Sequence, residues 1–130
     1  MENKIFPDWS GKKILLAEDE PVTVQYFKKI FLKNNVDISV VKDGDEAVNL
    51  IKNGADFDVI LMDLKMPVKN GFEATREIKK IRPDITIIAQ TAMAFPIDEE
   101  NARKAGCDDY ITKPIQYKSL IKKLIPYLGK

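Results

Sequence analysis

The chain has 130 residues and carries 21 Lys and Arg against 20 Asp and Glu, which gives a formal net charge of +1. A chain of this length forms one domain that buries a core without disulfides or a structural metal. The balanced charge gives no support to direct nucleic-acid binding by bulk electrostatics. No apolar run reaches the length of a membrane span, and no signal-peptide layout opens the chain.

Two residue counts restrict the chemistry further. Histidine is absent, which excludes histidine-based catalytic triads and histidine-ligated metals within this chain. A metal held here should therefore be a hard cation that prefers oxygen ligands. The single cysteine, Cys107, cannot form an internal disulfide, so we expect a reducing compartment, with the cytoplasm as the default. We interpret Cys107 as an inert small residue.

Residues 1–11 show no periodicity and contain Pro7, Trp9 and Gly11, so we expect a linker or disordered lead-in to a domain over residues 12–130. Trp9 has the option of packing against the domain, but an ordered tail is not the expected outcome.

From residue 12 onwards, short apolar runs alternate with amphipathic segments. The expected strands cover about residues 14–17, 37–41, 59–62, 85–90 and 110–112. The expected helices cover about residues 21–33, 45–53, 72–81, 96–105 and 116–128. Ile81 should face inward on the third helix, and Pro126 should fray or kink the end of the last helix.

Alternating strands and helices at these spacings predict parallel strands with right-handed crossovers. The expected fold class is α/β: a doubly wound five-stranded parallel sheet with helices on both faces, as in a flavodoxin-like three-layer sandwich. Strands buried on both faces explain why the apolar runs do not alternate cleanly with polar residues.

The central predicted strand, residues 59–62, ends abruptly at Asp63. Taken alone, Asp63 has an ordinary alternative role in starting a turn or capping a helix. However, Glu18 and Asp19 follow the first strand, Thr91 follows the fourth and Lys113 follows the fifth. Because the carboxyl ends of parallel strands share one edge, these groups should lie close together.

Three converging carboxylates would repel one another by roughly 4 kcal/mol per pair at about 4 Å, with an effective dielectric constant near 20. A Mg²⁺ ion would remove that cost, since it accepts carboxylate, water and phosphate oxygens. With Lys113 and the Thr91 hydroxyl added, the set describes a phosphoryl-transfer site in which Asp63 is the best candidate nucleophile. Individually, each residue also has an ordinary structural role; Thr91 alone would be a strand residue and Lys113 alone a solvated lysine.

From about residue 12 to residue 128 the sequence resembles the receiver domain of two-component response regulators. The resemblance depends on an ordered set of residues at the strand ends: Glu18-Asp19, Asp63 with Met66-Pro67, Asn70-Gly71, Thr91-Ala92, Tyr110 and Lys113-Pro114.

The resemblance implies that Asp63 is the phosphoacceptor. It also implies that Mg²⁺ is held by Glu18, Asp19, Asp63 and the main-chain carbonyl of Lys65. Many members of the family carry Asp where this chain has Glu18, so the longer side chain has the option of reaching the metal through a water. Lys65 could contact an incoming phosphate or shield the acyl phosphate from water.

The resemblance further implies that Thr91 and Lys113 bind phosphoryl oxygens, that Tyr110 is an aromatic switch residue, and that the Lys113-Pro114 bond is cis. Tyr110 is equally an ordinary aromatic residue at the edge of a core. The expected donor is a phosphohistidine on a sensor histidine kinase or a histidine phosphotransfer domain. The output surface would be the fourth helix, fifth strand and fifth helix, with a homodimer through that surface as one option.

Three functions remain in competition. The first is a phosphoacceptor switch that is not an enzyme in the usual sense, either stand-alone or as the receiver module of a hybrid sensor kinase. The second is a Mg²⁺-dependent phosphohydrolase with an aspartyl-phosphate intermediate; Lys65 counts against it, since haloacid dehalogenase-type enzymes usually place an acid two positions after the nucleophile. The third is an unphosphorylated interaction module, which the intact acid cluster and Lys113 argue against.

Overall fold

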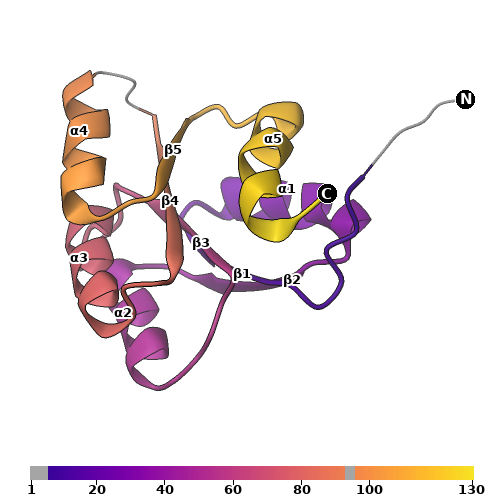
Figure 1. Cartoon of the computed structure of the whole chain (residues 1–130). Coiled ribbons are helices and arrows are strands. Elements are labelled where there is room, and N and C mark those ends of the chain that lie inside the picture. Colours follow the sequence, from indigo (N-terminus) through magenta and orange to yellow (C-terminus); the bar gives the residue numbers. More distant parts are fainter. Residues whose placement is uncertain (1–5, 93–95) are drawn as a thin grey trace, which may run out of the picture.

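In a computed structural model that describes residues 6–92 and 96–130, five strands form one parallel sheet in the order β2-β1-β3-β4-β5 (Figure 1). The strands are β1 (Lys13–Ala17), β2 (Asp37–Val41), β3 (Val59–Asp63), β4 (Thr86–Thr91) and β5 (Asp109–Thr112). The strand order reverses beside β1, which places ligand sites of such sheets at the carboxyl ends of β1 and β3. The predicted fold class is confirmed.

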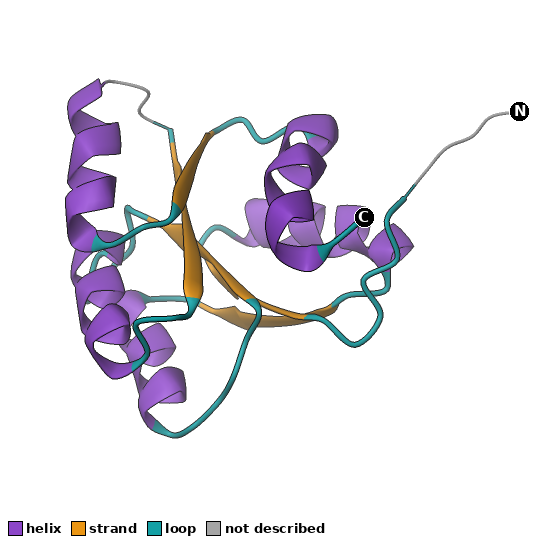
Figure 2. Cartoon of the chain, in the orientation of Figure 1, coloured by secondary structure: helices purple, strands orange, loops and turns teal. Residues whose placement is uncertain are grey.

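Helices cover both faces of this sheet (Figure 2). They are α1 (Pro21–Phe31, continued by a 3-10 turn over Leu32–Asn34), α2 (Gly44–Lys52), α3 (Gly71–Ile81), α4 (Pro96–Ala105) and α5 (Tyr117–Leu128). In Figure 1, α2, α3 and α4 lie on one side of the sheet, and α1 and α5 lie on the other. No helix in the described part of the chain is long and apolar enough to span a membrane.

The sheet separates two hydrophobic clusters. Every residue of β3 is buried, with Ile60 and Met62 in the cluster beneath α2, α3 and α4, and Val59 and Leu61 in the cluster beneath α1 and α5. This double burial is the reason for the uninterrupted apolar run before Asp63.

Two details of the helices differ from the prediction. Ile81 is 39% exposed, because it lies in the last turn of α3 beyond the edge of the sheet cluster. Pro126 does not end α5, which continues to Leu128. A proline in the last turn removes only one of the few remaining helical hydrogen bonds, so the helix can continue past it.

Residues 6–11, which the sequence led us to expect in a linker or disordered lead-in, pack against the domain; residues 1–5 lie outside the described residues. Trp9 is 1% exposed, its indole Nε1 donates to the carbonyl of Gly129 at 2.6 Å, and its ring contacts Phe31. Asn34, itself fully buried, donates to the carbonyl of Pro7 at 2.8 Å. This segment therefore joins α1 to the end of α5.

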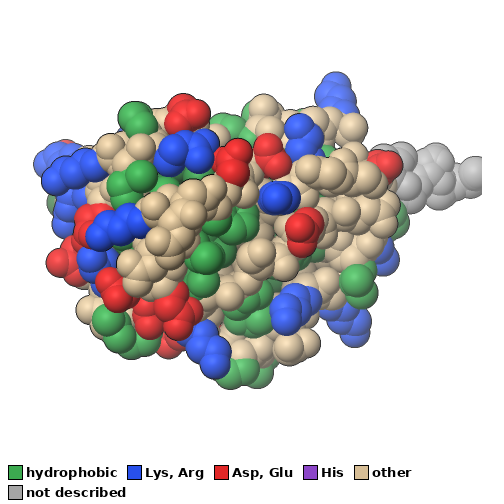
Figure 3. Space-filling model, turned by 90° about the horizontal axis from the view of Figure 1, so that it is seen from below, with side chains coloured by type: hydrophobic (Ala, Val, Ile, Leu, Met, Phe, Trp, Pro, Cys, Tyr) green, Lys and Arg blue, Asp and Glu red, His purple; other side chains and the backbone are tan. Residues whose placement is uncertain are grey.

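Charged side chains on the face seen in Figure 3 are mixed in sign, in keeping with the formal net charge of +1.

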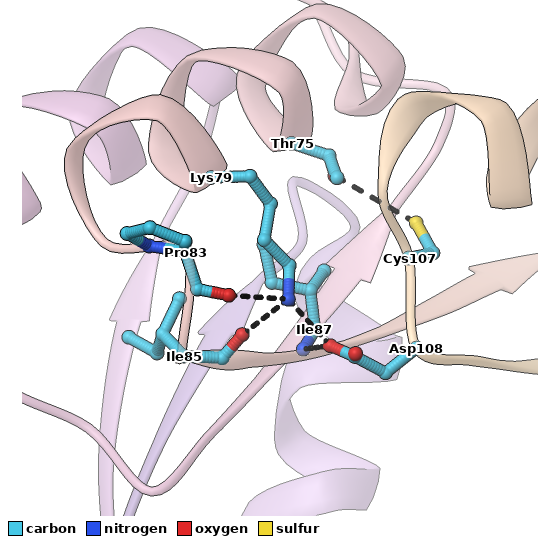
Figure 4. A network of polar contacts seen from close by, with 7 residues as sticks. All are labelled: Thr75, Lys79, Pro83, Ile85, Ile87, Cys107 and Asp108. Carbon is cyan, nitrogen blue, oxygen red and sulfur yellow. Dashed lines mark hydrogen bonds and ion pairs between the residues drawn. The ribbon is translucent and has the colours of Figure 1, made fainter.

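A network of hydrogen bonds and an ion pair lies at the amino edge of the sheet (Figure 4). The Lys79 ammonium on α3 donates to the Ile85 carbonyl at 2.6 Å and to Asp108 Oδ2 at 2.8 Å, and that same oxygen accepts from the Ile87 amide at 2.9 Å. Lys79 thus connects α3 to the residues directly before β4 and β5.

We expect Lys79→Met to lower the free energy of unfolding by about 1–2 kcal/mol, since the Ile85 carbonyl loses its lysine donor and Asp108 loses its charged partner. Urea unfolding followed by circular dichroism measures the change. Lys80→Met is the matched control, because Lys80 is exposed on the same helix. Equal midpoints for the two variants would show that the network contributes nothing to stability.

Candidate functional site

Three carboxylates lie together at the carboxyl edge of the sheet. Glu18 directly follows β1, Asp19 is the next residue, and Asp63 is the last residue of β3. Each offers an oxygen that lies within 4.8 Å of the other two. Glu18 and Asp63 are buried, whereas Asp19 is exposed. The convergence expected from the strand ends is therefore present.

Lys113 reaches this group from beyond β5. Its Nζ donates to Glu18 Oε1 at 3.0 Å and lies 3.4 Å from Asp63 Oδ2. Burial lowers the pKa of Lys113, but the hydrogen bond to Glu18 and the attraction of Asp63 outweigh it, so the pKa is raised and the ammonium stays charged. The Lys113-Pro114 peptide bond is cis, as the resemblance implied.

Glu18 is the most enclosed of the three acids, with 1% of its surface exposed. Burial raises the pKa of the Glu18 carboxyl, and the Asp63 charge adds to this, while the hydrogen bond from Lys113 opposes it. The other oxygen, Oε2, accepts from the main-chain amide of Glu20 at 3.1 Å. Glu18 is thus held on both oxygens by the protein, and Asp19 is the acid that faces solvent.

Thr91 is the last residue of β4, as expected, and Tyr110 is the second residue of β5. Thr91 is 5% exposed, and its carbonyl accepts from the Lys113 amide at 2.7 Å, which ties the end of β4 to the segment that carries the lysine. Tyr110 is partly buried and packs against the cluster beneath α4. It lines a hollow of about 460 Å³ formed by residues of α4, β5 and α5.

The loop after β3 completes the site. The Lys65 amide donates to Asp63 Oδ1 at 3.1 Å, whereas the Lys65 side chain is exposed. A Cβ atom on Gly71 would clash with the carbonyl of Asp63, so only glycine lets α3 begin this close to the acid. Asn70 caps α3 by accepting from the Glu73 amide at 3.0 Å. A hollow of about 580 Å³ between Asp19 and this loop opens beside the acids.

The donor set fits a divalent cation. Two ionised carboxylates whose oxygens lie 4.8 Å apart or less repel by about 3 kcal/mol or more at an effective dielectric constant of about 20. One lysine cannot neutralise three such groups. All the donors are oxygens, which suits Mg²⁺ or Ca²⁺ better than a soft metal.

Cys107 and Gln90 lie outside this donor set. Burial raises the pKa of the Cys107 thiol to about 11, which agrees with the inert role predicted for it. Gln90, a buried side chain of β4, was not among the predicted site residues; its only signal in the sequence was a polar residue inside an apolar strand.

We expect Asp19→Asn to weaken Mg²⁺ binding by about tenfold or more, because one of three negative charges around the ion is lost. The rise in melting temperature as MgCl₂ is added gives the affinity. Glu20→Gln removes a neighbouring exposed charge outside the cluster and serves as the control. Equal Mg²⁺ responses in the two variants would exclude Asp19 from the metal site.

A doubly wound parallel sheet with an acidic cluster and a lysine at its carboxyl edge is typical of α/β domains that bind a cation and a phosphoryl group there. Residues 14–125 match the response regulator receiver domain family, and the chain belongs to this family. It is a receiver domain of a two-component phosphorelay.

The relatives place such domains in two settings. Hybrid signal transduction histidine kinase I of Dictyostelium discoideum is 38% identical over 117 residues, which are 84% of this chain but 7% of that protein. The chain therefore spans only a small part of this relative. The polar-differentiation response regulator DivK of Brucella anthropi is 33% identical over 121 residues, 91% of this chain and 97% of DivK.

Solved structures agree with the fold. The receiver domain of sensor histidine kinase PA1611 from Pseudomonas aeruginosa, with magnesium coordinated in its active-site cleft, is 36% identical with a TM-score of 0.84 and covers 93% of this chain and 100% of its own. A co-crystal structure from Saccharomyces cerevisiae pairs the histidine phosphotransfer protein Ypd1 with the receiver domain of Ssk1. It matches with 30% identity and a TM-score of 0.85, over 96% of this chain and 92% of that chain.

Proposed function

We propose that Asp63 is the phosphoacceptor of this receiver domain and that Mg²⁺ is its metal. The observation that carries the proposal is the position of the Lys113 ammonium, 3.0 Å from Glu18 and 3.4 Å from Asp63. It draws groups from β1, β3 and β5 into one site of mixed charge, beside the exposed acid Asp19. Simple ion pairing accounts for one of these acids but leaves the other two uncompensated.

The chemistry follows from these groups. A carboxylate oxygen of Asp63 attacks the phosphorus of a phosphohistidine; the new P–O bond forms as the P–N bond breaks, and the electron pair leaves with the imidazole nitrogen. Lys113 stabilises the charge on the phosphoryl oxygens, and the Thr91 hydroxyl donates a hydrogen bond to one of them. Mg²⁺ would be held by Glu18, Asp19 and Asp63, together with the main-chain carbonyl of Lys65. When bound, the ion neutralises the carboxylates and orients the phosphoryl oxygens.

Phosphorylation of Asp63 would change the surface formed by α4, β5 and α5. The hollow beside Tyr110 offers space for a change of rotamer once Thr91 moves towards the phosphoryl group. The surface of α4, β5 and α5 would then change and present the output, with self-association through it as one form. The donor would be a sensor histidine kinase or a histidine phosphotransfer domain, and the domain would act either within a hybrid kinase or alone.

Incubation with Mg²⁺ and acetyl phosphate should give wild-type protein that carries one phosphoryl group, seen by intact-mass spectrometry as an acid-stable, base-labile adduct. Asp63→Asn should carry none, because the nucleophile is gone, whereas Asp37→Asn, an exposed acid far from the site, should behave as wild type. Slow decay with little net turnover supports the receiver. Steady hydrolysis of acetyl phosphate would instead indicate a phosphohydrolase, and no adduct would indicate an interaction module.

Lys65 is proposed to shield the aspartyl phosphate from water. We expect Lys65→Ala to shorten the lifetime of the adduct by a few-fold, because the exposed lysine side chain two residues after Asp63 is removed. Decay is followed after removal of the phosphodonor, with Lys118→Ala on α5 as a control lysine. Identical lifetimes in Lys65→Ala and wild type would remove this role.

A further inference from the structure

Gln90 of β4 is a buried amide without a visible role in the fold. Its side chain is 0% exposed, and within residues 6–92 and 96–130 neither Oε1 nor Nε2 has a hydrogen-bond partner. Its main-chain carbonyl, by contrast, accepts from the Leu64 amide at 3.1 Å. Buried polar side chains are nearly always paired, and an unpaired one costs more than an apolar residue of the same size. The position of Gln90 suggests why an amide is kept there.

Gln90 lies beside the proposed phosphoacceptor. It is the direct partner of Asp63 in the register of β3 and β4, which run about 4.8 Å apart. Ile88, two residues earlier, packs with Leu61 in the cluster beneath α1 and α5. Side chains two residues apart share a face of a sheet, so Gln90 and Asp63 extend from the same face.

Lys113 passes close to this position. It begins beyond the end of β5, and its ammonium contacts acids that follow β1 and end β3. Since β4 lies between β5 and β3, the lysine side chain must cross the end of β4, beside Thr91 and just beyond Gln90. Gln90 is therefore the neighbour of Asp63 in the sheet and lies just before the level at which Lys113 crosses β4.

We propose that Gln90 is a positioning residue for Lys113 in the phosphoryl-accepting site. In the present arrangement Lys113 is divided between Glu18 and Asp63. Once Asp63 carries a phosphoryl group, the ammonium turns to its oxygens, and one of its three N–H groups is free to donate to Gln90 Oε1. The amide would then fix the lysine over the phosphoryl group. This inference rests on the proposed role of Asp63.

Gln90→Met tests it, because methionine keeps the volume and removes both polar atoms. The free protein loses no hydrogen bond, so its melting temperature should stay the same or rise. The rate of phosphorylation by acetyl phosphate should fall about tenfold, the effect of one hydrogen bond to a charged group. The gain in melting temperature with Mg²⁺ and beryllium trifluoride, a phosphoryl mimic, should shrink. Gln90→Leu should repeat this pattern, and Ile88→Met, on the same face of β4, should leave rate and gain unchanged.

A second readout is spectroscopic. The side-chain amide resonances of Gln90, assigned by their loss in Gln90→Met, should shift and become protected from exchange when wild type is loaded with Mg²⁺ and beryllium trifluoride. Two results would overturn the proposal. One is a gain in melting temperature with Mg²⁺ and beryllium trifluoride that is the same in Gln90→Met as in wild type. The other is a set of Gln90 side-chain resonances that do not shift when wild type is loaded. A wild-type protein that forms no adduct at Asp63 would overturn the proposed function first, and the role of Gln90 with it.

Discussion

One ammonium group, that of Lys113, joins the ends of β1, β3 and β5 at the edge of the sheet. Its attraction to two largely buried carboxylates is offset by the cost of removing all three charges from water, so the pairing contributes little net stability. Its importance lies in the charge that remains. With Asp19 included, three acids face one lysine, and this excess prepares the edge for a cation and a phosphoryl group.

Most of this edge could be predicted from sequence, and the reason is topological. Parallel strands deliver their carboxyl ends to the same side, so the residues that follow each apolar run are neighbours in space wherever they lie in the chain. Glu18, Asp63 and Lys113 were placed together on this basis alone. Their distances and burial needed coordinates, because the path of a long side chain such as Lys113 is set by packing and not by spacing.

The missed features depend on contacts between distant segments. Trp9 looked like part of a tail because its partner, the Gly129 carbonyl, lies 120 residues away and carries no local signal. Gln90 looked like an ordinary strand residue, since nothing in a single sequence tells which face of a strand meets a crossing lysine. Ile81 lies on the helical face predicted to point inward, but it is the last residue of α3 and remains 39% exposed.

The two edges of the sheet use carboxylates in opposite ways. At the amino edge, Asp58 accepts from the Lys13 amide at 2.8 Å and Asp108 accepts from the Ile87 amide at 2.9 Å, so each acid stabilises the start of a strand. Lys79 adds a matching charge to Asp108. At the carboxyl edge the acids outnumber their partners. Because the amino edge and the two core clusters carry the stability of the fold, the carboxyl edge can gain a cation and a phosphoryl group without unfolding the sheet that positions it.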